Sequence, residues 1–422
     1  MSAGSQDVLV VPADWIQRTG LDQFPATMST TSKSVDHACI VGIGQSEFTP
    51  WGGIADRSQF QITAQAILTA LDDAGLTRSD VDGFASFSND SNDAPLMQVA
   101  LGVPELRWSS MVWGGGGGGS IAALSHACSA VESGQASVVV VYRGLCQGQS
   151  GRFGKIGQGR IHGHGNFVDP FGLFAPSQML ALLARRFMYL YPITHDHLAE
   201  VVLNARANAN RNPRAVMYGR PLSREAYFAG RWIAEPLRVF DCCLETDGAC
   251  AVVVTTRERA QDLRAQRVDV LAVGHGSGPG WGSGPLGSHN MPEDDYASTN
   301  SRRLATRLFA EAGLGPNDID VVQFYDHFSP LVLMALEDYG FCGPGESGDF
   351  VAAGAIRPDG KLPINTAGGL LSEAYVHGLN LLTEGVRQLR GESTTQIAGA
   401  STCLVTGGLG VSPTSGVILG RH

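Results

Sequence analysis

The sequence lacks the features that mark several common classes of protein. Its 8 cysteines are scattered, with no CxxC pair and no Cys/His spacing typical of a zinc site. No apolar run reaches the length that a membrane span needs, and the N-terminus lacks the basic and apolar regions of a secretory signal. We therefore expect buried thiols in a reducing cytoplasm, with no metal site and no membrane partner.

Positive charge is scarce as well. The 30 Lys and Arg residues are outnumbered by 40 Asp and Glu residues, which gives a net charge of -10. Nucleic acid is therefore not expected as a partner, because binding to a phosphate backbone needs a basic face. The chain is instead rather apolar, with 43% hydrophobic and 17% charged residues, as in a globular protein with a sizeable core.

The pattern along the chain indicates two similar halves after a short extension. Residues 1–35 show no sustained period and end in a Ser/Thr-rich tract, so we expect a flexible N-terminal extension there. Strand-like and helix-like runs then alternate, and their order recurs in the second half. This predicts a duplicated α/β protein with an N-terminal half over 36–265, a cover loop at about 150–240 within it, and a C-terminal half over 266–422.

Six consecutive glycines, Gly114 to Gly119, stand directly in front of an apolar run with helical spacing. Glycine loses more conformational entropy on folding than other residues, so a run of six needs a structural reason. A glycine turn at a helix N-terminus exposes backbone N–H groups that can stabilise an oxyanion. The run also fits a dinucleotide-binding pattern, but glycine repeats match any such pattern and the expected acidic residue is missing, so we reject that interpretation.

Four segments, in the right order, resemble the thiolase superfamily and within it the sterol-carrier-protein-type thiolases. They are "CIVGIGQSEFTP", "GGSIAALSHACSAVESGQASVVVV", "DCCLETDGACAVVV" and "GGLLSEAYVHGLN". The third is close to the family's DCCP-x-SDGAAAVVV segment and is the most specific match. The resemblance spans the chain from about His37 to its end. It implies a duplicated thiolase fold of the α/β class, five-layered α-β-α-β-α with mixed sheets.

The departures from the family pattern concern its catalytic residues. The thiolase cysteine nucleophile falls at Gly116, so no acyl-enzyme is expected at this turn. The histidine of the family's GHP motif falls at Tyr375, and the first position of its NEAF or HDCF motif falls at Tyr325, in "YDHF". Two tyrosines and a glycine at these positions resemble the lipid-transfer-protein-type aldolases of bacterial steroid side-chain breakdown.

That resemblance implies retro-aldol cleavage of a steroid side-chain β-hydroxyacyl-CoA of the 17-hydroxy type. The expected products are a 17-ketosteroid and a short acyl-CoA such as propionyl-CoA or acetyl-CoA, formed by tyrosine acid–base catalysis. No cofactor is expected, since CoA is part of the substrate. The expected catalytic residues are Tyr325, Tyr375, Asp326 and His327. The expected substrate- or CoA-binding residues are Gly116, Gly117, Gly119, Ser120, Gly368, Gly369 and His377.

The resemblance also implies partners. Thiolases pair an edge strand across a two-fold axis, and the strand expected at 136–144, "ASVVVVYRG", resembles that edge, so we expect a homodimer. The related aldolases work with a small OB-fold, zinc-ribbon protein, so we expect an α2β2 complex with such a partner. Arg152, Lys155 and Arg160 would face either the CoA phosphates or solvent.

Several alternatives stay open at this point. A tyrosine is commonly a core or interface residue with its hydroxyl satisfied. If Asp326 and His327 lie on a strand they face opposite ways, so one could orient a tyrosine while the other packs elsewhere. His377 and Cys403 also fit structural roles, the latter as a buried thiol. The alternative functions are a cysteine-less thiolase-like acyltransferase and a non-catalytic lipid-binding homologue; paired tyrosines favour the aldolase.

Overall fold

The computed structural model describes residues 37–113, 117–149, 166, 169–263, 266–281 and 293–421. Residues Asp36–His422 form one compact unit. The predicted N-terminal extension lies outside the described residues, and so does most of the first part of the predicted cover loop. The boundary predicted between two halves at 265 and 266 stays a prediction.

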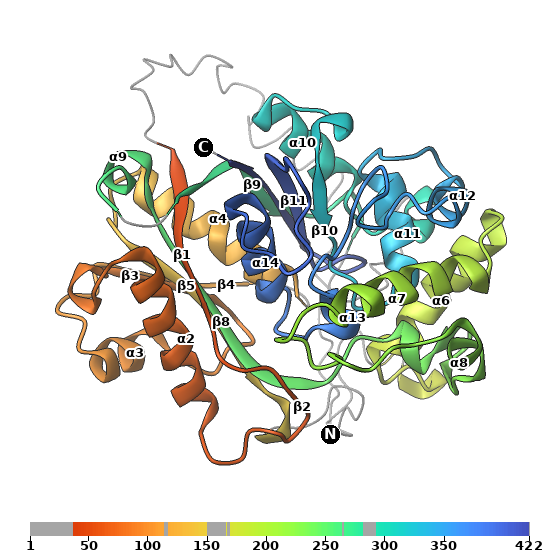
Figure 1. Ribbon diagram of the computed structural model, residues 1–422, viewed down its shortest axis with the longest axis horizontal. Coiled ribbons are helices and arrows are strands. Elements are labelled where there is room, and N and C mark those ends of the chain that lie inside the picture. The colour runs from red at the N-terminus through yellow and green to blue at the C-terminus, as the bar shows by residue number, and fades with distance from the viewer. Residues whose placement is uncertain are drawn as a thin grey trace, which may run out of the picture. The chain divides into compact units, whose positions relative to one another are not determined.

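The described strands form one mixed sheet and a small separate hairpin (Figure 1). The sheet comprises β1 (Ala38–Gln45), β2 (Thr49–Pro50), β3 (Gly83–Phe87), β4 (Trp108–Val112), β5 (Val139–Cys146), β8 (Thr246–Thr256), β9 (Val268–Gly276), β10 (Val321–Gln323), β11 (Thr402–Gly407) and β12 (Thr414–Arg421). The hairpin comprises β6 (Trp232–Ala234) and β7 (Leu237–Arg238). The strand order is β10-β11-β12-β9-β1-β8-β5-β3-β4, with β2 on β8. The β1–β9 contact spans only two residue pairs, so it joins two larger groups of strands.

Helices lie on the outer faces of these two groups and between them. The described helices are α2 (Gln59–Ala74), α3 (Ala94–Leu101), α4 (Gly118–Glu132), α6 (Pro176–Leu190), α7 (His195–Ala209), α8 (Arg224–Ala229), α9 (Arg257–Ala260), α10 (Arg302–Ala312), α11 (Ser329–Asp338), α12 (Ser347–Ala352), α13 (Gly369–Ser372) and α14 (Leu379–Arg390). α4 and α14 pack against strands of both groups, whereas α2 packs on β1, β5 and β8, and α10 on β9 and β12. These five layers confirm the predicted fold class (Figure 1).

The local sequence explains where the central and outer helices begin and end. α2 starts at a capping box made by Ser58 and Gln61 and stops at Gly75, which adopts a left-handed conformation. Its buried side chains recur at helical spacing and face β1 and β8. α4 is instead buried along most of its length and rich in Gly, Ala and Ser, which suits a helix placed between two layers of strands.

Helices α6, α7, α8, α11, α12 and α13 gather at one side of the molecule (Figure 1). α7 contacts α11, α12 and α13, so the 195–209 segment packs against the second half of the chain. α6 and α7 fall on "SQMLALLARRFMYLY" and "HDHLAEVVLNARANANRNP", whose apolar residues recur at helical spacing. The described part of the cover region is therefore largely helical.

The predicted dimer-edge strand is wrong. β5, the "VVVYRGLC" strand, lies inside the sheet, where it pairs with β3 on one side and with β8 on the other. The edge at this end of the sheet is β4, which pairs only with β3 among the described strands. The physical reason lies in the burial: every residue of β5 is buried, whereas exposed side chains occur along β4.

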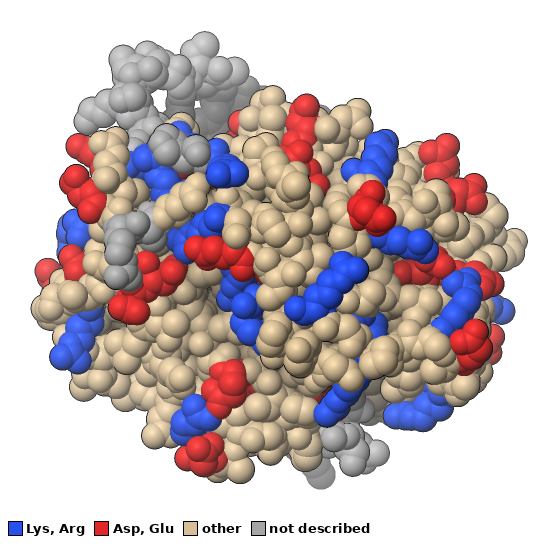
Figure 2. Space-filling view, in the orientation of Figure 1, with Lys and Arg blue, Asp and Glu red and all other residues tan. Residues whose placement is uncertain are grey.

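The charged side chains do not gather by sign on the face drawn in Figure 2. Acidic and basic residues are interspersed there, with no extended area of one sign among the described residues. That face therefore offers no broad basic surface of the kind that binds a phosphate backbone. None of the described helices is long and apolar enough to cross a bilayer.

Candidate active site

The two tyrosines singled out in the sequence meet in the folded chain. Tyr325 follows β10 and Tyr375 follows α13, yet their hydroxyl oxygens lie 3.0 Å apart. Both side chains are buried, with exposed fractions of 1% and 8%. Their rings meet edge to face, with centroids 6.3 Å apart. A buried, hydrogen-bonded pair of phenols can pass a proton between its members or share the charge of one phenolate.

Short backbone contacts fix each tyrosine in place. The Tyr325 N–H donates to Thr406 Oγ1 at 2.8 Å. The Tyr375 N–H donates to Thr246 Oγ1 at 2.9 Å, and that hydroxyl donates to the Tyr375 carbonyl at 3.1 Å. Thr406 lies on β11 and Thr246 on β8. Each tyrosine is therefore held by a strand from a different one of the two groups of strands.

The end of the glycine run makes room for the tyrosine pair. A Cβ placed on Gly117 would overlap the Tyr325 hydroxyl, and one on Gly119 would overlap the ring of Phe87. Gly117 is the N-cap of α4, so Tyr325 lies directly against the start of that buried helix. The structural reason for glycine at Gly117 is therefore close approach by a site residue. Gly116, the position of the missing nucleophile, lies outside the described residues.

The environment sets the acidity of the pair. Burial raises the pKa of Tyr325 well above its ordinary value, the neighbouring Tyr375 and Cys243 raise it further, and Arg143 lowers it. Burial and Cys243 also raise the pKa of Tyr375, but here the hydrogen bond from Tyr325 lowers it, as does Arg143. Either hydroxyl can donate in the 3.0 Å contact between them. Burial is the largest effect on both tyrosines, and it opposes ionisation of either one.

Asp326 and His327 take different positions. The Asp326 carboxylate accepts from the Leu370 N–H at 2.7 Å and the Leu371 N–H at 3.4 Å, which anchors the α13 turn. Burial raises the Asp326 pKa to about 7 against the lowering effect of these bonds. The His327 ring lies 4.8 Å from the Tyr325 ring, centroid to centroid, and burial lowers its pKa to about 4. Asp326 therefore supports the backbone, whereas a neutral His327 packs on a tyrosine.

Two of the predicted binding glycines, Gly368 and Gly369, lie where the chain is tightly packed, and their role in binding stays a prediction. A Cβ on Gly369 would overlap the Asp326 carboxylate, and one on Gly368 would lie 2.7 Å from Ala209 Cβ. Both glycines have positive φ, which lets the chain turn into α13 at this crowded place. Ser120 lies in the first turn of α4, and its buried Oγ has no hydrogen-bond partner in the described part of the chain.

Residues that the sequence interpretation missed surround the pair. Arg143 on β5 is buried, with 2% of its surface exposed, and its Nε donates to His377 Nδ1 at 3.0 Å. Its Nη1 forms an ion pair with Asp90 at 3.0 Å. A charge on the Cys243 thiol raises the pKa of both tyrosines. A basic residue inside a valine-rich strand was the one signal in the sequence for Arg143, because a charge there must be paired.

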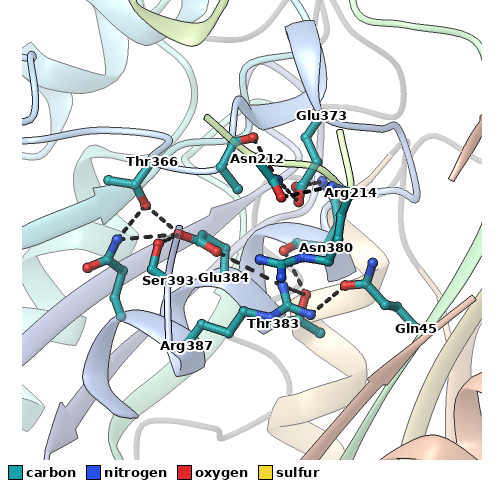
Figure 3. A network of polar contacts seen from close by, with 12 residues as sticks. Gln45, Asn212, Arg214, Thr366, Glu373, Asn380, Thr383, Glu384, Arg387 and Ser393 are labelled. Atoms are coloured by element: carbon teal, nitrogen blue, oxygen red, sulfur yellow. Dashed lines mark hydrogen bonds and ion pairs between the residues drawn. The ribbon is translucent and has the colours of Figure 1, made fainter. Parts of the chain in front are cut away.

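A second buried network includes Glu373, two residues before Tyr375 in the sequence (Figure 3). Glu373 accepts from Asn212 Nδ2 at 3.1 Å and from Asn380 Nδ2 at 3.0 Å, and burial with the charge of Glu384 raises its pKa to about 7. Glu384 accepts from three side chains of the surrounding segments, and Arg387 donates to Gln45 on β1. This network ties the segment that carries Tyr375 to α14 and β1.

Cys403 and three basic residues were also singled out in the sequence. Cys403 is fully buried on β11, and burial raises its pKa well above the ordinary value, so it is a core thiol. Arg152, Lys155 and Arg160 lie outside the described residues. Within the described ranges, no group of three His, Cys, Asp or Glu side chains is arranged to hold a metal ion.

Comparison with known proteins identifies the relatives of this chain. A family model, "Thiolase C-terminal domain-like", matches residues 287–421. The 17-hydroxy-3-oxo-4-pregnene-20-carboxyl-CoA lyase of Mycobacterium tuberculosis is 44% identical over 390 residues, which covers 91% of this chain and 99% of that protein. A steroid side-chain-cleaving aldolase of Thermomonospora curvata is 41% identical over 389 residues, covering 91% and 97%. A solved Ltp2-ChsH2(DUF35) aldolase structure matches with a TM-score of 0.86 and 39% identity, covering 92% and 99%.

The five-layered fold and the matching family model define a thiolase-like protein. Within that class, the chain belongs to the family of steroid side-chain-cleaving aldolases.

Proposed function

We propose that this chain is a carbon–carbon lyase that cleaves a 17-hydroxy steroid side-chain acyl-CoA by a retro-aldol reaction. The products would be a 17-ketosteroid and a short acyl-CoA, such as propionyl-CoA. The names of the two relatives at 44% and 41% identity support the reaction and the substrate class. The observation that carries the mechanism is the buried pair of tyrosine hydroxyls 3.0 Å apart.

Tyr375 is proposed as the base and Tyr325 as its hydrogen-bond donor. In the first step the β-hydroxyl proton passes to the Tyr375 phenolate, the bond between the α- and β-carbons breaks, and the β-carbon becomes a ketone. The bonding electrons move into the thioester enolate. In the second step Tyr375 returns the proton to the α-carbon, which yields the short acyl-CoA. All substrate atoms appear in the two products, so the scheme consumes no co-substrate.

No acyl-enzyme is needed in this scheme. A glycine stands at Gly116, where thiolases carry the nucleophile. The thiol of Cys128, later in α4, is buried, and burial raises its pKa well above the ordinary value, so little reactive thiolate forms there. The pKa of the half-buried Cys243 thiol is likewise raised well above its ordinary value by desolvation. The proposal therefore assigns catalysis to oxygen acids rather than to sulfur.

The test is a product analysis with the chain in complex with its partner protein. Incubation with a 17-hydroxy steroid β-hydroxyacyl-CoA should yield equimolar ketosteroid and short acyl-CoA by mass spectrometry, and intact-mass analysis should show no acylated protein. An acyltransferase would instead give an acylated protein or a longer acyl chain from two thioesters. Substrate that binds but is recovered unchanged would favour the lipid-binding alternative.

For the assembly we propose an α2β2 complex with a small OB-fold, zinc-ribbon protein. The solved relative is named for two proteins, as an Ltp2-ChsH2(DUF35) aldolase, and this supports a second protein as partner. The homodimer at the centre of the complex would pair β4 with β4, since β4 is the strand at the edge of the described sheet. Cys128, Cys243 and Cys403 are thiols rather than members of disulfides, which fits the reducing cytoplasm that we propose as the location.

A further inference from the structure

A buried chain of polar groups runs from the loop after β3 to the tyrosine pair. Asp90 accepts from Arg143 Nη1 at 3.0 Å and from the Gly144 N–H at 3.1 Å. Arg143 Nε in turn donates to His377 Nδ1 at 3.0 Å. The His377 ring lies edge to face against the Tyr375 ring, with centroids 5.0 Å apart. An arginine cation is thus placed one ring away from the proposed base.

Removing the charged Arg143 guanidinium from water costs free energy, so its burial suggests a function. Arg143 and Asp90 are almost fully enclosed, with side-chain exposures of 2% and 0%. Desolvating an ion pair can cost as much as its attraction returns, so such a pair is weak evidence for a role in stability. The guanidinium also lies over the Phe87 ring, 5.0 Å from the centroid, which holds it against the site. Its position between Asp90 and the tyrosines favours an electrostatic role.

The hydrogen bond also fixes the state of His377. A guanidinium can only donate, so His377 Nδ1 must accept, and the ring is neutral with its proton on Nε2. Burial, Arg143 and His327 together lower the His377 pKa well below its ordinary value. His377 therefore adds no second cation beside Arg143. The hydrogen bond from Arg143 fixes the orientation of the His377 ring, and that ring packs on Tyr375.

We propose that Arg143, held by Asp90 and His377, is a positioning residue that stabilises the tyrosinate of the Tyr325–Tyr375 pair. This inference rests on the proposed retro-aldol function. The lowering effect of Arg143 on the pKa of both tyrosines supports it, since it opposes the effect of burial. The other titratable groups that act on the pair are Cys243, which raises both pKa values, and His327, which packs on Tyr325.

The first test compares His377→Asn with His377→Asp by their pH–rate profiles. His377 has a φ of 48°, and Asn and Asp are residues that tolerate this left-handed region. The two variants match in size and backbone preference but differ by one negative charge beside Arg143. We expect the ascending limb of kcat, which reports deprotonation of the tyrosine base, to lie about 1–3 pH units higher in the Asp variant than in the Asn variant. Coinciding limbs would overturn the proposal.

The second test removes the cation. Asp90→Asn with Arg143→Gln takes out both charges, so no unpaired carboxylate stays buried. We expect kcat near neutral pH to fall about tenfold for each pH unit by which the limb rises, while KM changes far less. Arg143→Lys, which keeps a charge, should recover part of the loss. A double variant with the wild-type limb would refute the electrostatic role.

A matched control separates this effect from general destabilisation. Arg390 on α14 is equally enclosed, with a side-chain exposure of 3%, and pairs with Asp73 at 2.7 Å. Arg390→Gln should lower the melting temperature without moving the limb. If the wild-type complex itself gave no retro-aldol products, the proposed function would fail first, so the two failures can be told apart.

Discussion

At the scale of single residues, the proposed chemistry depends on the unequal members of the tyrosine pair. The proposal assigns the base to Tyr375 and the hydrogen-bond donor to Tyr325, whose hydroxyl oxygens lie 3.0 Å apart. Tyr375→Phe removes the proposed base but keeps the ring that packs against His377. We expect kcat to fall about 10²–10⁴-fold, as for the loss of an acid–base group, with little change in melting temperature. Steady-state kinetics with thermal denaturation checks this.

The companion variant distinguishes the two roles. Tyr325→Phe removes the proposed donor to Tyr375, so the ascending limb of kcat, which reports deprotonation of the base, should move to higher pH while activity is retained above it. The Tyr375→Phe variant should show no such recovery at high pH. If Tyr325→Phe were the one without recovery, the assignment of base and donor would be reversed.

Gly117 offers a steric test of the same site. A Cβ there would overlap the Tyr325 hydroxyl, so Gly117→Ala must displace the tyrosine or the start of α4. We expect a loss of at least tenfold in kcat, because an acid–base group that moves by about an ångström loses its geometry. Gly315→Ala is the control, since its Cβ would meet only Asp318 at 3.6 Å. Equal activity of the two variants would contradict the role of Gly117.

The sequence led to part of this site and not to the rest, for physical reasons. Tyr325 and Tyr375 stood in motifs that could be aligned with the family, so their positions could be predicted although their 3.0 Å contact could not. Arg143 carries no such motif, because its role depends on Asp90 and His377, which lie far from it in the sequence. Pairwise burial of charge is a property of the fold and leaves little trace in a single sequence.

At the scale of elements, the β5 strand shows what a hydrophobic run does and does not specify. A continuous run of valines favours a strand buried on both faces, and β5 is buried along its whole length. The run carried no information about which neighbours would pair with it, and the predicted edge position was wrong. Burial follows from composition, whereas strand order follows from the connections, which include the crossing through α4.

The network of Figure 3 makes the segment before Tyr375 sensitive to pH. Glu373 has a pKa of about 7 in the folded chain against an ordinary value of 4.5, so the folded state binds its proton more tightly. Its contribution to stability is therefore fully present below about pH 4.5 and is lost as the pH rises through about 7. Glu373→Gln should remove this loss. Between about pH 4.5 and 7, the free energy of unfolding of the variant should therefore rise relative to that of the wild type, by on the order of 3 kcal/mol.

Denaturant unfolding at several pH values measures this difference. Glu373→Gln also alters the bonds from Asn212 and Asn380, but that offset does not depend on pH, so only the slope is diagnostic. Glu392→Gln, at an exposed position just after α14, should follow the wild type at every pH. Parallel curves for Glu373→Gln and the wild type would show that Glu373 is ionised alike in both states.

At the scale of the whole molecule, β4 leaves an open sheet edge that an assembly would cover. It pairs with β3 alone among the described strands, and Met111 within it is 45% exposed, next to Trp113 at 81%. An exposed apolar edge of this kind invites pairing with another strand. In a two-fold dimer the same residue faces its own copy or a near neighbour, so a charge placed there meets a like charge.

We therefore expect Met111→Lys to convert the proposed homodimer into monomers, as measured by light scattering at micromolar concentration. Lysine suits an exposed edge strand and should leave the fold of the single chain intact, which circular dichroism would verify. Leu68→Lys is the control, because Leu68 is 47% exposed on α2, away from the sheet edge, and should leave the dimer unchanged. A dimer that survives Met111→Lys, or a wild-type monomer, would show that β4 is not the paired edge and would leave the partner protein as the remaining candidate to cover it.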